Sequence, residues 1–276
     1  MFRNITIGQF YPCDSILHRL DPRVKLLGVV VYIASLFVIN NIWGFIFIFL
    51  VLLGLIKLSN VPVNYILRGM KVVWFIIIIA VIFNLFFTEG DLVLAKWWIF
   101  TISTKGILNA LFFAIRLIFI IVGASLLTYT TTPTSLTEGM EKVFSPLKKI
   151  HFPAHEIAMM MSIALRFIPI LAEEAGKITK AQTSRGADFD TGGIVAKAKG
   201  MIPILVPLFV SAFKRANDLA CAMEARCYKG GEGRTKMYPL KYESRDKIAY
   251  FTVLGYVIVF ILIRILMDMF VTSGRI

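Results

Sequence analysis

The sequence is poor in charged residues and lacks a nucleotide-binding motif. Only 17% of its residues are Asp, Glu, Lys or Arg, whereas an average soluble domain has about 25%. The phosphate-binding pattern G-x-x-x-x-G-K-[ST] is absent, because Gly176-Lys177 is followed by Ile178 and lacks the upstream glycine. We therefore expect neither a soluble protein nor a chain that hydrolyses ATP by itself.

Cysteine is scarce, and so are the features of a secreted protein. Cys13, Cys221 and Cys227 are odd in number and fit neither a disulfide framework nor a zinc site. Reduced thiols on the cytosolic side of a membrane are expected instead. The first 25 residues contain Pro12 and Asp14 rather than the apolar run of a cleavable signal peptide. We expect the first spanning helix to act as the insertion signal.

Apolar residues, in contrast, make up 58% of the 276 residues and include 23 Phe. A helix needs about 20 mainly apolar residues to cross a bilayer, and five runs approach this length. The runs are 26–39, 43–58, 72–87, 106–128 and 248–267. The first two runs are separated only by residues 40–42, which include Asn40 and Asn41. This spacing predicts a helical hairpin with a tight polar turn. The expected fold class is all-α, a polytopic membrane protein with about five transmembrane helices.

The formal net charge is +13. In a soluble protein this would indicate nucleic-acid binding, but no basic and aromatic platform lies outside the apolar runs. Lys and Arg gather in the connections, as in cytoplasmic loops of membrane proteins: residues 1–25 have four, 40–42 have none and 131–247 have 18. The N-terminus and the long region are predicted to be cytoplasmic and the C-terminus external, with no nucleic-acid partner.

The long polar region is predicted to contain three helices. The first covers 134–147, the second is an amphipathic helix over 155–184, and the third runs from 194 to about 225. Both long helices carry an apolar stripe but are interpreted as too charged to span a bilayer. Glu173 and Lys177, four residues apart, are interpreted as a solvated pair on one helix. Pro169, Pro203 and Pro207 lie inside the long helices and are expected to bend them.

The predicted organisation has three parts. Residues 1–132 hold the N-terminal segment and transmembrane helices 1–4, residues 133–247 form a cytosolic coupling-helix region, and residues 248–276 hold the C-terminal transmembrane helix.

Each long helix ends on an arginine between small residues. The two triplets are Ser184-Arg185-Gly186 and Ala225-Arg226-Cys227. An arginine at a helix C-terminus interacts favourably with the helix dipole and stabilises the helix by about 0.3–1 kcal/mol. This stabilisation alone would explain a single arginine at such a position. Two of them, about forty residues apart, favour a docking role. Small neighbours let a planar guanidinium approach a partner and form paired hydrogen bonds to carboxylates or carbonyls.

Other polar residues offer alternatives. Asp188 and Asp190 have the spacing of two-carboxylate metal motifs in some transferases, although helix capping also accounts for them. His151 and His155 are four residues apart, but no third metal ligand is near in sequence. Arg116 interrupts the fourth apolar run and is costly against lipid. It is expected to face the bundle interior, a partner or water, either in a pairing role or in a substrate path.

Four stretches together resemble the transmembrane T component of energy-coupling factor (ECF) transporters, EcfT. They are GQFYPCDSILHRLDPRVK at 8–25, Thr131-Thr132-Pro133 with Leu136 and Pro146-Leu147, residues 164–186, and AMEARCY at 222–228. The resemblance covers nearly the whole chain and is greatest for the shared-module type, which serves many exchangeable substrate binders. One departure is that the family's Ala-Arg-Gly motif has serine before the first arginine and cysteine after the second.

The resemblance implies a non-catalytic scaffold subunit of an ABC-type importer in the cell membrane. Arg185 and Arg226 would each dock into one of two ATPase subunits, EcfA and EcfA′, which bind ATP and Mg²⁺, while this chain binds no cofactor. The long helices would press against the S component, which binds a vitamin or another micronutrient. The alternatives are a membrane-embedded lipid-linked transferase using Asp188 and Asp190, and a secondary transporter, for which the required inverted repeats are not evident.

Overall fold

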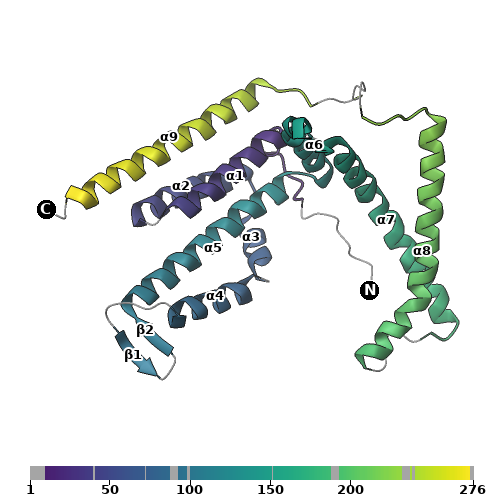
Figure 1. Cartoon of the computed structure of the whole chain (residues 1–276), viewed down its shortest axis with the longest axis horizontal. Coiled ribbons are helices and arrows are strands. Elements are labelled where there is room, and N and C mark those ends of the chain that lie inside the picture. Colours follow the sequence, from purple (N-terminus) through teal and green to yellow (C-terminus); the bar gives the residue numbers. More distant parts are fainter. Residues whose placement is uncertain are drawn as a thin grey trace. The chain divides into compact units, whose positions relative to one another are not determined.

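The computed structural model describes residues 10–39, 41–71, 73–87, 93–97, 100–150, 152–187, 193–231, 237 and 240–273. The described residues form two compact units, shown in Figure 1 and treated separately below. The bundle unit lies within residues 9–139 and 240–276, and the hairpin unit lies within residues 140–239.

Helices make up nearly all of the described chain, which confirms the predicted all-α fold class. The bundle unit contains α1 (Pro22–Val38), α2 (Ile42–Ser59), α3 (Val63–Met70), α4 (Trp74–Phe87), β1 (Val93–Trp97), β2 (Phe100–Ser103), α5 (Thr104–Thr130) and α9 (Ser244–Ser273). Helix α6 (Pro133–Phe144) leads from the bundle unit into the hairpin unit, which contains the 3₁₀ helix η1 (Ser145–Ile150), α7 (Ala154–Ser184) and α8 (Ile194–Ala225). The three helices expected between 134 and 225 are thus confirmed.

Two small elements were not predicted. Helix α3 has only eight residues, which is too short for hydrophobic periodicity to reveal it. Strands β1 and β2 form an antiparallel hairpin in which Trp97 lies opposite Phe100 and Val93 opposite Ser103. Among the described residues, the fold is therefore all-α apart from one two-stranded hairpin within the connection between α4 and α5.

Four described helices are long and apolar enough to cross a bilayer: α2, α5, α7 and residues 244–266 of α9. Three of these match predicted spans, whereas α4 is shorter and α1 has 17 residues. The expectation that α7 is too charged to span a bilayer is wrong, because its charged residues are concentrated from Glu173 onward. Residues 154–171 contain only Glu156 and Arg166 as charged side chains. By length and composition, this helix too qualifies as a membrane span.

Helix α5 is the centre of the bundle unit and contacts α1, α2, α3 and α4. The core is apolar, with Leu36 of α1 and Ile48 of α2 fully buried. Two glycines, Gly69 of α3 and Gly123 of α5, permit the closest approaches in the bundle unit. A Cβ atom on Gly123 of α5 would overlap the ring of Tyr32, whose hydroxyl donates to the Phe119 carbonyl at 3.1 Å.

The N-terminal segment is tied to the ends of two helices by polar contacts. Lys25 Nζ donates to the carbonyl of Thr130, the last residue of α5, at 2.9 Å. Asp246 in the first turn of α9 accepts from Asp21 N at 2.9 Å and from Glu243 N at 2.8 Å, which satisfies donors at the starts of α1 and α9 together. Burial lowers the pKa of Lys25 to about 8, against the opposing charges of Asp21 and Asp246. These contacts link the start of α1 to the end of α5 and to the start of α9.

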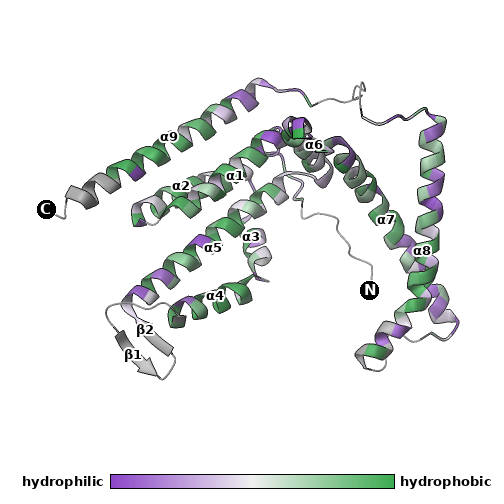
Figure 2. Ribbon diagram, in the orientation of Figure 1, coloured by the Kyte–Doolittle hydropathy of each residue, from purple (hydrophilic) through white to green (hydrophobic). Residues whose placement is uncertain are grey.

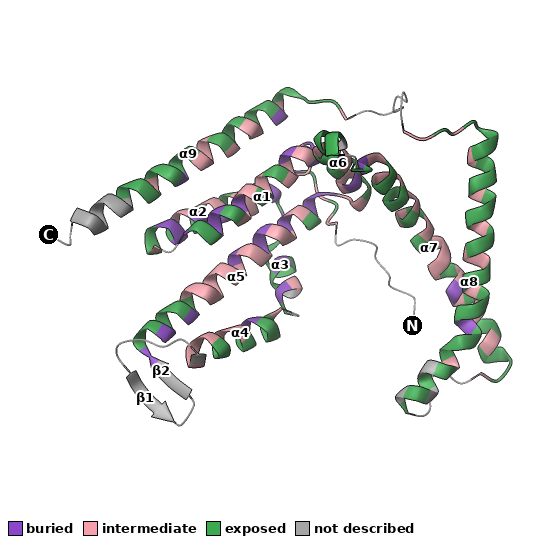
Figure 3. Ribbon diagram, in the orientation of Figure 1, coloured by how far each residue is buried: buried purple, intermediate pink, exposed green. Residues whose placement is uncertain are grey.

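Large apolar side chains cover much of the outside of the bundle unit. Helices α2, α4 and α9 are mostly hydrophobic (Figure 2) and largely exposed (Figure 3). Phe75 of α4 and Phe251 of α9, for example, are 71% and 75% exposed. Exposed apolar surface of this extent marks contact with lipid or with another protein.

Replacing Gly123 by alanine is expected to destabilise the bundle unit by about 1–3 kcal/mol, because the added methyl group overpacks against the Tyr32 ring. Thermal unfolding of the purified chain in detergent measures this loss. Gly54→Ala in α2 is the matched control, since a Cβ atom there meets no atom within 4 Å. The control should be neutral or stabilising, and an equal loss of stability in both variants would contradict the packing argument.

Candidate functional site

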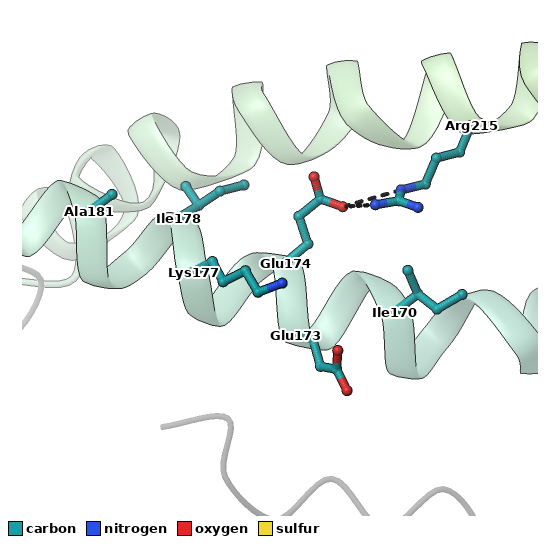
Figure 4. Close-up of a pocket in the computed structure, with 7 residues that line it drawn as sticks. All are labelled: Ile170, Glu173, Glu174, Lys177, Ile178, Ala181 and Arg215. Atoms are coloured by element: carbon teal, nitrogen blue, oxygen red, sulfur yellow. Dashed lines mark hydrogen bonds and ion pairs between the residues drawn. The ribbon is translucent and has the colours of Figure 1, made fainter.

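The hairpin unit is built on the antiparallel crossing of α7 and α8. Glu174 of α7 faces Arg215 of α8, and Gln182 of α7 faces Pro203 of α8. Residue numbers therefore rise along one helix as they fall along the other, so the C-terminal ends of α7 and α8 point in opposite directions from the crossing. A groove of about 390 Å³ lies at this crossing, and its lining is shown in Figure 4. The lining residues are Ile170, Glu173, Glu174, Lys177, Ile178, Ala181 and Arg215.

Arg185 is the C-cap of α7. The following residue, Gly186, has φ +87° and donates its N–H to the Thr183 carbonyl at 3.0 Å, while Ala187 N donates to the Gln182 carbonyl at 3.0 Å. This pair of bonds defines a Schellman motif, which satisfies carbonyls at the helix end. Gly186 therefore ends α7, as glycine commonly does just past the C-terminus of a helix.

Arg226 has the same position at the end of α8. Cys227 has φ +56° and donates to the Glu224 carbonyl at 2.8 Å, and Tyr228 N donates to the Met223 carbonyl at 3.0 Å. The two arginines thus occupy the C-cap of two equivalent Schellman motifs. We call the triplets 184–186 and 225–227 the arginine tips.

Both arginine tips are exposed at all six positions: Ser184, Arg185, Gly186, Ala225, Arg226 and Cys227. Within the described residues, neither guanidinium makes an ion pair. Each is held beyond the last turn of a helix, where the backbone dipole favours positive charge. The small neighbours leave the planar group open to approach. The arrangement is suited to binding carboxylates or carbonyls of another macromolecule.

The other candidate residues do not form a site in the described structure. Asp188, Asp190 and His151 lie outside the described residues. His155 Nδ1 contacts Glu141 Oε1 at 2.9 Å, and no group of three potential metal ligands occurs in the described part of the chain. Arg116 donates from Nη2 to the carbonyl of Ile39 at 2.6 Å, the C-cap of α1. Of the alternatives for Arg116, the pairing role is the one the geometry supports.

Comparison with known proteins assigns the family. The family model described as "Cobalt transport protein" (CbiQ) matches residues 14–237. A protein of Clostridium kluyveri named energy-coupling factor transporter transmembrane protein EcfT is 50% identical over 266 residues, covering 96% of this chain and 98% of the relative. The chain belongs to the EcfT family.

Other EcfT relatives extend this similarity. That of Ruminiclostridium cellulolyticum is 48% identical over 97% of this chain and 98% of its own length, and that of Bacillus subtilis is 42% identical over 89% and 93%. Together with the apolar helices, this membership makes the chain a multi-pass membrane protein and a transmembrane subunit of an ECF transporter. The relatives are named as transmembrane components of a transporter rather than as enzymes.

Sequence reasoning missed one interaction of the site. It paired Glu173 with Lys177 along one helix, whereas the ion pair between the helices is formed by the neighbouring Glu174 with Arg215. Figure 4 shows Glu173 pointing away from α8 and Glu174 pointing toward Arg215. Glu174 and Arg215 are 41 positions apart, so no local sequence pattern selects this pair.

Replacing Cys227 by glycine is expected to stabilise the end of α8 by about 1 kcal/mol, since only glycine adopts positive φ without a Cβ penalty. Slower amide hydrogen exchange at residues 223–228 is the measurement. Gly186→Cys is the mirror-image control and should accelerate exchange at the end of α7. Unchanged exchange in both variants would show that left-handed geometry does not limit either helix end.

Proposed function

We propose that the chain is the coupling subunit of an ECF importer for vitamins or other micronutrients, of the shared-module type. In this proposal Arg185 docks into one ABC ATPase subunit and Arg226 into the other, EcfA and EcfA′, which bind ATP and Mg²⁺. The observation that carries it is the equivalence of the two arginine tips, both exposed and both held by the same C-cap geometry. Two equivalent docking points suit two similar motor subunits.

The S component is proposed to bind the apolar surface of α7 and α8. This surface is exposed in the described chain and combines flexible methionines with aromatic residues, which adapt well to different partners. Its exposed members are Met160, Met161 and Ile168 on α7, and Leu205, Val206, Phe209, Val210 and Phe213 on α8. An adaptable apolar surface supports exchange of one membrane-embedded substrate binder for another.

Transport then requires mechanical coupling between these surfaces. ATP binding closes the two ATPases and displaces the docked tips, and α7 and α8 carry the displacement to the S component, which releases its substrate inward. Such coupling needs contacts that differ in free energy between the two states. We place the N-terminus and the two arginine tips of the coupling-helix region 133–247 on the cytoplasmic side, where the concentration of Lys and Arg favours them. The apolar first part of α7 then lies in or against the bilayer.

Charge reversal of both tips, Arg185→Glu with Arg226→Glu, tests docking. Each tip is expected to lose charge-assisted hydrogen bonds worth about 1.5–3 kcal/mol each, or roughly a tenfold or greater loss of affinity per tip. The cognate ATPases should no longer co-purify, and uptake of a radiolabelled vitamin by cells that co-express an S component should cease.

The matched control reverses two exposed lysines on the same helices, Lys180→Glu with Lys214→Glu. It makes the same change of net charge away from the tips and should retain both ATPases. Replacing Asp188 and Asp190 by asparagine should also leave uptake intact. Normal uptake in the tip variant, or its loss in the aspartate variant, would refute the proposed roles.

A further inference from the structure

A three-residue polar contact joins α7 to α8 at their crossing. The Glu174 carboxylate accepts from Arg215 through Nη2 at 2.8 Å and Nε at 3.2 Å, both on Oε2. Its other oxygen, Oε1, accepts from the Ser211 hydroxyl at 2.5 Å. The Glu174 side chain is 23% exposed and that of Arg215 is 42% exposed, so water only partly covers the pair. We call these three residues the crossing clamp (Figure 4).

A second contact lies further along the same crossing. Pro207 has no backbone N–H, so the Pro203 carbonyl four residues earlier lacks the donor that an α-helix normally supplies. Gln182 Nε2 of α7 donates to this carbonyl at 3.5 Å, at the long end of the range for a hydrogen bond. The break in α8 therefore provides an acceptor that α7 uses.

Apolar burial contributes little to the crossing. Among the side chains that the structure describes, only Ala154 and Ala175 of α7 and Ile204 of α8 are buried. Two long helices with so few buried side chains have little packing to define the angle between them. The polar contacts of the crossing clamp are therefore the main restraint on that angle.

The crossing clamp is equally distant from the two arginine tips. Eleven residues separate Glu174 from Arg185, and eleven separate Arg215 from Arg226. At 1.5 Å per residue each arm is about 16 Å long. Eleven residues are also close to three full turns of 3.6 residues, so each clamp residue lies on the same side of its helix as the arginine of its own tip.

We propose that Glu174 and Arg215 are positioning residues that hold α7 and α8 at their crossing, so that a displacement of one arginine tip reaches the other helix. This inference rests on the proposed function, because the tips are moved only if the ATPases dock there. Without the clamp, the helices still reach the ATPases, but they turn independently about a poorly packed crossing. ATP hydrolysis is then no longer matched by movement of the S component.

The experiment combines a distance measurement with transport. Nitroxide labels are attached through ketone-bearing non-natural amino acids introduced at positions 180 and 221, each exposed and five residues before its arginine. This chemistry does not react with thiols, so Cys13 and Cys227 stay in place and the tip 225–227 is unchanged. The chain is purified with its ATPases and a co-expressed S component, and the distance between the labels is measured by pulsed electron resonance. Vitamin uptake per ATP hydrolysed is measured in the same complex.

Glu174→Gln removes the charge of the clamp with little change in shape. We expect a broader distribution of label distances and a several-fold fall in uptake per ATP, while both ATPases remain bound. The matched control is Glu173→Gln, since Glu173 points away from α8 (Figure 4), and it should change neither measurement. The charge swap Glu174→Arg with Arg215→Glu should restore the narrow distribution and most of the uptake.

Parental uptake in Glu174→Gln, an equal effect of Glu173→Gln, or a charge swap that fails to restore uptake would each overturn the clamp. If Glu174→Gln does not assemble, the charge swap decides the question alone. A failure of the proposed docking role is recognised separately. In that case the double tip variant, Arg185→Glu with Arg226→Glu, still retains both ATPases. That result leaves the label distances, and the clamp that they report, untouched.

Discussion

The rest of this structure depends on satisfying backbone carbonyls where helices end or break. Water cannot supply the missing hydrogen bonds inside a bilayer, so each such carbonyl needs a donor from the protein. Arg116 donates to Ile39 at the end of α1, and Lys25 donates to Thr130 at the end of α5. Gln182 reaches the Pro203 carbonyl that Pro207 leaves open. Arg116, Lys25 and Gln182 thus each supply a donor to a backbone carbonyl that lacks its helical partner.

The same requirement produces the arginine tips. A Schellman motif satisfies the last carbonyls of α7 and α8 by backbone bonds alone, so neither Arg185 nor Arg226 is needed for that purpose. Their guanidinium groups remain exposed beyond the helix and are available for a partner. Gly186 adopts the required left-handed conformation freely, whereas Cys227 does so against its Cβ atom. A strained helix end next to an exposed arginine agrees with a functional use of that position.

Long helices were predictable because their signals are local. The bounds of α7 and α8 match the expected 155–184 and 194–225 closely, since Gly186 ends one helix and Gly193 precedes the other. The short helix α3 and the β1–β2 hairpin gave no comparable signal. The expectation that α7 is too charged to span rests on the number of its charges and ignores where they lie along the helix. Four of its six charges lie from Glu173 onward, and the preceding residues are as apolar as a membrane span.

The sequence by itself determined the membrane class, the family resemblance and the two arginine tips, because hydrophobic runs, helix terminators and small-residue triplets are properties of neighbouring residues. Only the tertiary structure decided which partners the polar residues find. Glu173 and Glu174 are adjacent residues of the same type. Glu173 nevertheless points away from α8, whereas Glu174 binds Arg215, 41 positions later in the chain. The physical reason is rotation: adjacent residues of a helix point about 100° apart, and only the packing of the second helix selects one of them.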